Sequence, residues 1–313
     1  MTDSIMENHH ENFKGIIAII LASFLWGTTG TAASYSTDVS SLAIGAFSMG
    51  IGGVLLVIAA QKELFKDYRL MFEQPKVLLF GAASVAIYPL AFYTSMRLSG
   101  VAVGTVISIA TAPFFAAILE RLISKKNISL QWILSFVIGA IGIALLTLDR
   151  DQSNDTAYSI HQQSLGILLG CIAGLTYAGY SWAARRLIES GVHSKSSMSG
   201  LFGCAALFLF PSLWFTGDNL FASSTNTVVS LYMAIIPMFL GYLFFGFGLN
   251  FIDASKATLI TLIEPLVATI LAIFIIGERF KVIGWVGIAL VSLCLLMQTI
   301  KPQSQLKLAI KST

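Results

Sequence analysis

Long apolar stretches alternate along the chain with short connections that carry most of the charged and turn-forming residues. Each stretch is close to the roughly 20 residues that an α-helix needs to cross the hydrocarbon core of a bilayer. The stretches cover residues 14–35, 41–60, 76–97, 101–120, 130–148, 165–186, 197–215, 228–250, 254–276 and 282–300. The pattern therefore predicts an all-α membrane protein with ten transmembrane helices.

The composition supports this prediction. Of the 313 residues, 56% are apolar and 11% are charged, whereas soluble domains have about 25% charged residues. On these grounds we do not expect a soluble globular fold, and no basic face with interleaved aromatics points to nucleic acid. The three cysteines lie inside apolar stretches without a CxxC or Cys/His spacing. We therefore expect no disulfide framework, no metal and no cofactor.

The basic residues are distributed unevenly between the two sides of the predicted bundle. Sixteen of the nineteen Lys and Arg residues are assigned to one side, Arg279 and Lys281 among them, which leaves Arg97, Arg150 and Lys256 on the other. Because Lys and Arg concentrate in cytoplasmic loops, both termini are predicted to be cytoplasmic. The acidic tail before the first stretch favours a retained helix over a secretory signal.

The first half of the chain corresponds to the second half at an offset of 151 or 152 residues. The aligned pairs are Ala22 with Ala173, Trp26 with Tyr177, Ala33 with Ala184, Ala102 with Ala254 and Pro113 with Pro265. The chain is thus predicted to consist of a cytoplasmic tail (1–13), a five-helix repeat (14–148), a periplasmic loop (149–164), a second five-helix repeat (165–300) and a cytoplasmic tail (301–313).

Five helices per repeat is an odd number, so the two repeats are inverted with respect to the membrane. Inverted repeats can exchange conformations, which opens a site near the membrane midplane first to one side and then to the other. This architecture is typical of alternating-access transport, although channels and membrane enzymes are also built from repeats.

Short motifs in both halves resemble a known family. The pattern Ala22-x-x-x-Trp26-Gly27 in the first stretch, Glu264-Pro265-Leu266 in the ninth and the following Gly277-Glu278-Arg279 are similar to the drug/metabolite transporter superfamily, in its EamA family. The first half departs from the pattern, because Lys125-Lys126-Asn127 stands where the second half has Gly277-Glu278-Arg279.

The resemblance covers nearly the whole chain and implies a ten-helix carrier of the bacterial inner membrane. Many members of this family export amino acids, other metabolites or drugs. It also implies a central cavity surrounded by the first, third, fourth, sixth, eighth and ninth helices.

Glu264 is the main candidate for a substrate or proton site. It stands in the middle of the ninth stretch, where a charged acid costs about 2.5–3.5 kcal/mol on insertion scales and normally faces a cavity or a partner. Pro265 has no N–H, so the carbonyl of Thr261 is expected to lose its helical partner. The alternative is a protonated Glu264 that hydrogen-bonds a neighbouring helix in a structural role.

Two polar stripes are predicted to face each other across the cavity. Thr258, Thr261 and Glu264 follow at intervals of three residues in the ninth stretch, and Thr105, Ser108 and Thr111 repeat that spacing in the fourth. Aromatic residues extend the candidate site, with packing against lipid or helices as the alternative; they are Trp26, Tyr88, Tyr93, Tyr177, Tyr180 and Tyr242. Four prolines are expected to kink their helices and serve as hinges: Pro89, Pro113, Pro237 and Pro265.

Two further acids are weaker candidates. Glu120, beside Arg121, is expected to reach the membrane interface and pair with surface cations. Glu278 and Arg279 are expected to form the cytoplasmic end of the ninth helix.

The sequence contains none of the common enzyme motifs, such as GxSxG, HExxH, a P-loop or a dinucleotide fingerprint. We therefore expect no enzymatic activity. The expected function is that of a secondary active transporter that exports an amino acid, another small metabolite or a drug. It is expected to act as a monomer or homodimer, with protons as a candidate coupling ion. A membrane-embedded enzyme or lipid-handling protein and a passive channel are the alternatives. Because the candidate cavity has one acid and no intramembrane Lys or Arg, a strongly anionic substrate is disfavoured.

Overall fold

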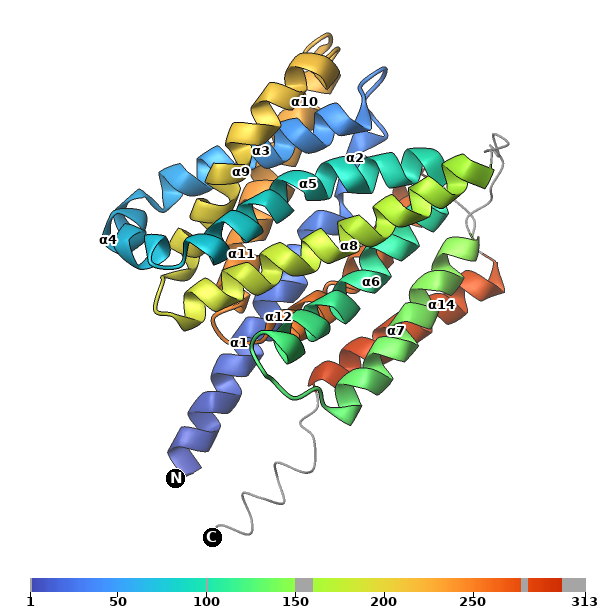
Figure 1. Cartoon of the computed structure of the whole chain (residues 1–313). Coiled ribbons are helices and arrows are strands. Elements are labelled where there is room, and N and C mark those ends of the chain that lie inside the picture. Colours follow the sequence, from blue (N-terminus) through green and yellow to red (C-terminus); the bar gives the residue numbers. More distant parts are fainter. Residues whose placement is uncertain (1, 100, 150–159, 277–280, 300–313) are drawn as a thin grey trace.

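The computed structural model describes residues 2–99, 101–149, 160–276 and 281–299, and every regular element in these ranges is a helix (Figure 1). The α-helices are α1 Thr2–Gly27, α2 Thr29–Ala33, α3 Ser41–Ala59, α4 Gln61–Phe72, α5 Pro75–Ser99, α6 Val101–Leu122, α7 Leu130–Asp149, α8 Ile160–Glu189, α9 Ser194–Thr216, α10 Ser224–Met233, α11 Gly241–Gly248, α12 Ala254–Ile260, α13 Ile263–Leu271 and α14 Val282–Thr299. Two π-helical segments, η1 Ala234–Leu240 and η2 Ala272–Ile276, continue α10 and α13.

Every predicted apolar stretch coincides with one helix or with a run of consecutive helices. The first stretch forms α1 and α2, the eighth forms α10, η1 and α11, and the ninth forms α12, α13 and η2. Among the described residues, seven segments are long and apolar enough to cross a membrane, and α7 and α14 contain the shorter apolar stretches Leu130–Leu145 and Val282–Gln298. The protein is therefore an all-helical membrane protein.

Two helical segments lie outside the predicted stretches. α1 begins at Thr2, because no Gly or Pro interrupts the polar residues that precede the apolar stretch. α4 occupies the connection between α3 and α5, where only a basic connection was expected.

The four prolines differ in their effect on helical structure. Pro237 lies inside η1, and Pro265 lies in the first turn of α13 directly after the break that separates it from α12. α5 and α6 continue without a break through Pro89 and Pro113. The carbonyl of Thr261 keeps a partner, because the N–H of Glu264 donates to it at 2.9 Å. The carbonyl thus lacks the i+4 partner that Pro265 cannot supply, as expected, and is met instead by the N–H three residues on.

The main helix contacts between the two halves are arranged symmetrically: each of them has a counterpart in which both helices are replaced by their equivalents from the other half. α3 packs along α9 and α7 along α14, and each of these pairs joins equivalent helices of the two halves. α5 packs along α8 as α11 packs along α1, and α6 packs against α8 as α13 packs against α1. Figure 1 shows α5 beside α8 and α7 beside α14. The internal similarity of the sequence is thus accompanied by an internal similarity of packing.

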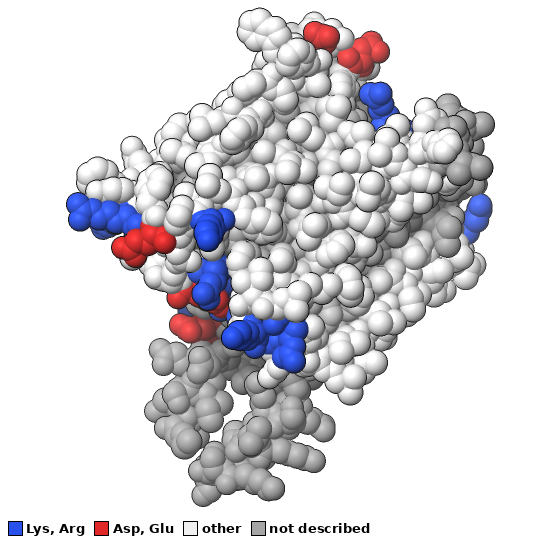
Figure 2. Space-filling view, in the orientation of Figure 1, with Lys and Arg blue, Asp and Glu red and all other residues white. Residues whose placement is uncertain are grey.

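One end of the molecule, here called the basic end, gathers the connections after α6, α8 and α11. Lys126 Nζ lies 2.5 Å from Asp253 Oδ1, so Lys256, three residues further on, belongs to the same end as Lys126. The assignment of Lys256 to the opposite side is therefore wrong, because successive helices alternate in direction. On the face shown in Figure 2, Lys and Arg gather at the lower left, where α4 and the end of α8 lie.

Lys281 also changes sides. It precedes α14, whose far end lies at the basic end because Gln131, at the start of α7, donates to the carbonyl of Met297. Lys256 thus joins the side with most of the Lys and Arg residues and Lys281 leaves it, so the uneven distribution of basic residues between the two sides remains. Arg150, Glu278, Arg279 and the segment 301–313 lie outside the described residues.

Candidate functional site

A cavity of about 50 Å³ lies between the helices of the two halves. The residues that line it come from α1, α2, α3, α5, α8, η1, α11 and α13; they are Trp26, Thr29, Gly45, Ser48, Met49, Tyr88, Pro89, Phe92, Tyr93, Tyr177, Tyr180, Met238, Tyr242 and Glu264. Glu264 and all six aromatic residues of the predicted site are among them. The cavity contains no Lys or Arg among these lining residues.

The aromatic side chains form a connected wall around the cavity. The ring centroids of Trp26 and Tyr242 are 4.9 Å apart, those of Tyr88 and Tyr177 are 5.6 Å apart, and those of Tyr177 and Tyr180 are 5.2 Å apart. The hydroxyls of Tyr180 and Tyr242 are hydrogen-bonded at 3.1 Å. Such contacts between rings restrict their motion, so the wall is held in a defined shape.

The Trp26 and Tyr177 side chains also bond to residues at helix irregularities near proline, Trp26 to a backbone carbonyl and Tyr177 to a side-chain hydroxyl. Trp26 Nε1 donates to the carbonyl of Pro237 in η1 at 2.9 Å. The hydroxyl of Tyr177 donates to Thr261 Oγ1, at the break before α13, at 2.8 Å. Thr261 is buried and does not line the cavity, so its contact with the site runs through Tyr177.

Glu264 is the acidic residue of the cavity. The break between α12 and α13 places it in the first turn of α13, where its side chain is half-buried. Within the part of the chain that the structure describes, its carboxylate has no hydrogen-bond donor and no cationic partner. A carboxylate in this position is stabilised by a bound proton or by a ligand that carries a positive charge or a hydrogen-bond donor.

The stripe predicted on α6 does not reach the cavity. Ser108 donates to the carbonyl of Gly104 and Thr111 to that of Ile107 within the helix, while Thr105 donates to Met96 Sδ at 3.3 Å. A Cβ added at Gly174 of α8 would collide with Thr111, so this face of α6 packs tightly against α8. Among the side chains of α6 that the structure describes, none lines the cavity, although the family resemblance implied that the fourth helix surrounds it.

Thr258 is likewise occupied inside its own helix. Its hydroxyl donates to the carbonyl of Ala254 at 2.8 Å, and the side chain is fully buried. The two polar stripes thus do not face each other across the cavity. Hydroxyls in helices commonly bond the carbonyl one turn back, which satisfies them without any ligand.

Helix α3 supplies lining residues that the sequence interpretation missed. Ser48 and Met49 reach the cavity, and a Cβ at Gly45 would collide with the ring of Tyr93. The high glycine content of this stretch could have indicated that α3 lies close to the cavity, because small residues allow helix backbones to approach closely. Thr29, Phe92 and Met238 were also missed.

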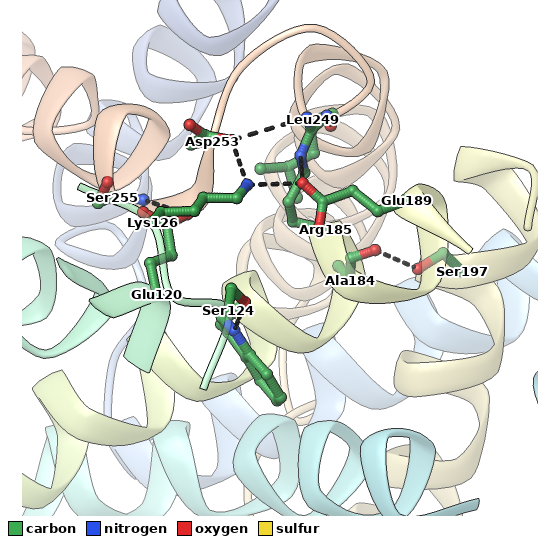
Figure 3. Close-up of polar contacts among 11 residues, drawn as sticks. Glu120, Ser124, Lys126, Ala184, Arg185, Glu189, Ser197, Leu249, Asp253 and Ser255 are labelled. Carbon is green, nitrogen blue, oxygen red and sulfur yellow. Dashed lines mark hydrogen bonds and ion pairs between the residues drawn. The ribbon is translucent and has the colours of Figure 1, made fainter. Parts of the chain in front are cut away.

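A cluster of ion pairs joins the connections at the basic end (Figure 3). Lys126 Nζ lies 2.6 Å from Glu189 Oε1 and 2.5 Å from Asp253 Oδ1. Arg185 Nε lies 3.0 Å from the same oxygen of Glu189, and an Nη of Arg185 lies 3.6 Å from Asp253. Desolvation lowers the pKa of Lys126, but its hydrogen bonds to Asp253 and Glu189 and their charges outweigh this effect and raise the pKa above 10.5.

Glu120 lies inside the protein beneath this cluster. It is 4% exposed, and its Oε1 accepts a hydrogen bond from the N–H of Ser255, in the first turn of α12, at 3.3 Å. The expectation that Glu120 reaches the interface and pairs with surface cations is therefore wrong. The N–H groups at a helix start attract a carboxylate, which accounts for its inward position.

The fold is that of a multi-pass membrane protein. Its two halves surround a cavity of the kind that binds a small molecule. Comparison with known families identifies it further: the chain belongs to the EamA-like transporter family, whose model matches residues 13–148 and again residues 164–299. The protein is thus a membrane transporter and not an enzyme, and its substrate is a small molecule.

Similar proteins extend over nearly the whole chain. The uncharacterized transporter YwfM of Bacillus subtilis is 33% identical over 92% of this chain and 94% of its own. The uncharacterized inner membrane transporter YicL of Salmonella typhimurium is 24% identical over 89% of this chain and 92% of its own. A crystal structure with 14% identity superposes with a TM-score of 0.75 over 90% of this chain and 95% of the other, which supports the fold alone.

Proposed function

We propose that the protein is a secondary active transporter that exports an amino acid, another small metabolite or a drug across the inner membrane by alternating access, with Glu264 at the binding site and protons as the coupling ion. The observation that carries the proposal is the carboxylate of Glu264, which has no partner among the described residues and lies in a cavity lined by both halves. The relative YicL is described as an inner membrane transporter, which supports the location.

The proposed architecture is ten transmembrane helices in two inverted five-helix repeats, 14–148 and 165–300, with both termini in the cytoplasm. Three observations support it. All ten predicted stretches form helices. Each main helix contact between the halves has a counterpart formed by the equivalent helices, and the basic end retains most of the Lys and Arg residues. By the positive-inside rule the basic end is then cytoplasmic.

The ion cluster supports an alternating mechanism. It joins a connection of the first half, which carries Lys126, to two places in the second half, the end of α8 at Glu189 and the connection that carries Asp253. A path from the cavity to the cytoplasm requires these connections to separate. We therefore assign the present arrangement to a state closed towards the cytoplasm.

The lining narrows the range of substrates. Aromatic rings and a single acid favour amines, aromatic compounds, amino acids and cationic or neutral drugs, because rings and a carboxylate both attract positive charge. The absence of Lys and Arg from the lining residues disfavours phosphate esters and other strongly anionic compounds.

Transport by the purified protein in proteoliposomes tests the proposal. Labelled amino acids and cationic dyes are supplied under an imposed pH gradient, and we expect saturable transport with counterflow that collapses with the gradient. Glu264→Gln should reduce transport at least tenfold at unchanged folded yield. Glu120→Gln is the matched control, because Glu120 is a buried acid outside the cavity. Normal transport by Glu264→Gln at several pH values would refute the site assignment, and flux without counterflow would indicate a channel.

A further inference from the structure

Helix α4 presents three different faces, each formed by residues three and four positions apart. Leu64, Asp67 and Met71 form one face, Phe65, Tyr68 and Phe72 a second, and Lys62, Lys66 and Arg69 a third. Residues at these spacings lie one above another on a helix surface. The helix therefore separates its packing, aromatic and basic residues into parallel stripes.

The first face attaches α4 to the protein. Met71 is buried in the main core and Leu64 packs against that core. Asp67 Oδ2 accepts a hydrogen bond from the N–H of His193 at 2.9 Å, directly before α9. α4 is thus fixed at the basic end, between the end of α3 and the start of α5. Because the first face packs against the protein, the aromatic and basic faces of α4 are held in fixed orientations.

The aromatic face is exposed. Phe65 is 80% exposed and Phe72 is 69% exposed, which is costly in water for side chains of this size. An apolar groove of about 250 Å³ begins at Tyr68 and Phe72 and continues along α9 past Gly200, Gly203 and Cys204. Because Cys204 lies ten residues after the start of α9, the groove reaches roughly 15 Å into the depth spanned by that helix.

The basic face lies beside the aromatic one. Lys62, Lys66 and Arg69 are all exposed, and within the described part of the chain none of them has an acidic partner within salt-bridge distance. Arg69 Nε donates to the hydroxyl of Tyr68 at 3.0 Å, which connects the two stripes. Three exposed cations without an acidic partner in the described part of the chain, placed at the end of membrane-spanning helices, complement an anionic headgroup.

We infer that α4 and the groove along α9 form a binding site for an anionic glycerophospholipid of the leaflet at the basic end. The phosphate and headgroup lie against Lys62, Lys66 and Arg69, Phe65 and Phe72 insert among the acyl chains, and one acyl chain occupies the groove beside Cys204. This site is separate from the Glu264 cavity and does not depend on the transported substrate.

Native mass spectrometry of the detergent-purified protein, titrated with phosphatidylglycerol and with phosphatidylcholine, tests the headgroup part. The wild type should bind phosphatidylglycerol far more tightly than phosphatidylcholine. Each neutralised cation should weaken this binding about fivefold, so the combined change Lys62→Gln, Lys66→Gln and Arg69→Gln should weaken it about a hundredfold. The matched control is Lys125→Gln with Arg186→Gln, two exposed cations at the same end outside α4, which should retain the wild-type affinity.

The groove is tested by chain length. The wild type should bind dioleoyl phosphatidylglycerol more tightly than the dihexanoyl form, and Cys204→Trp, which fills the groove, should remove this preference while the selectivity for phosphatidylglycerol over phosphatidylcholine remains. Equal affinity for phosphatidylglycerol and phosphatidylcholine, or unchanged affinity in the triple variant, would overturn the inference. A chain-length preference that persists in correctly folded Cys204→Trp would overturn the placement of the acyl chain.

Discussion

At the scale of single residues, the polar groups of the repeat-related aromatics Trp26 and Tyr177 bond to residues at helix irregularities near proline. Trp26 bonds the carbonyl of Pro237, and Tyr177 bonds Thr261 next to the break before Pro265. Buried Tyr and Trp need such partners, and proline removes the N–H that would otherwise organise the backbone there. The aromatic wall of the cavity and the break that positions Glu264 are therefore stabilised together.

Removal of the two hydroxyls that join Tyr177 and Thr261 should have unequal effects. In Tyr177→Phe the hydroxyl of Thr261 still donates to the carbonyl of Thr258 at 2.8 Å, so we expect a loss of about 1 kcal/mol of stability. Thr261→Val leaves the buried hydroxyl of Tyr177 without an acceptor, which should cost about 1–3 kcal/mol. Thermal unfolding of both variants in the same detergent measures the difference, and a larger loss in Tyr177→Phe would contradict the hydrogen-bond direction.

The residues of the site could be predicted where a polar side chain in an apolar stretch needs a polar environment. They could not be predicted where a hydroxyl is already hydrogen-bonded within its own helix or to a neighbouring side chain. Glu264 and the aromatics lie at the cavity, because an acid or a tyrosine inside an apolar stretch needs a polar environment. Thr105, Ser108 and Thr111 have the same spacing as a polar stripe, but their hydroxyls bond inside α6 or to Met96. A pattern of hydroxyl residues alone does not distinguish these two cases.

At the scale of helices, close approach through glycine brings α1 against the segment that carries Glu264. A Cβ at Gly27 would lie 2.6 Å from Cβ of Val267 and 2.9 Å from the carbonyl oxygen of Glu264. Such distances are possible only without a side chain, so α1 and α13 are in direct backbone contact there. The position of Glu264 therefore depends on this contact.

Gly27→Ala should force α1 and α13 apart. We expect a loss of about 1–3 kcal/mol of stability from overpacking, with transport reduced because Glu264 is displaced. Gly30→Ala is the matched control, since a Cβ there would meet nothing within 4 Å. Folded yield, thermal unfolding and transport are measured for both variants, and equal behaviour of the two would show that the contact is unimportant.

The helices themselves were predictable from the length of the apolar stretches, because the bilayer requires continuous helices with internally satisfied backbones. α4 was not predicted, since its short amphipathic pattern lies between two stronger apolar signals. The side assigned to Lys256 was wrong for a different reason: it departed from the strict alternation of the helices, which the contact of Lys126 with Asp253 makes evident.

At the scale of the whole molecule, the ion cluster connects the halves at one end while the cavity lies between them. Lys126 contacts both Glu189 and Asp253 and so joins the connection after α6 to the end of α8 and to the connection after α11. Its partial burial reduces screening by solvent relative to a fully exposed pair. If the halves alternate, this contact contributes to the stability of one state over the other.

Lys126→Gln should therefore weaken the state closed at the basic end. We expect faster hydrogen–deuterium exchange in peptides that cover residues 121–130 and 249–256, together with an altered ratio of transport in the two directions. Lys125→Gln is the matched control, because Lys125 is an exposed neighbour with no ion pair among the described residues. Identical exchange in both variants would exclude a role of the cluster in closure.

The pH dependence of transport distinguishes the cluster from the cavity. The pKa of Lys126 is raised above 10.5, so its favourable ion pairs are fully present below that value and are lost only as the pH rises through the higher pKa of the folded state. Lysine therefore keeps its charge between about pH 6 and pH 9, and Lys126→Gln should change the rate of transport without changing the shape of its pH profile in that range. Glu264→Gln should flatten the profile, because the proposed proton site is removed. A profile that keeps its shape in Glu264→Gln but is flattened in Lys126→Gln would place the pH-sensitive step at the basic end rather than in the cavity.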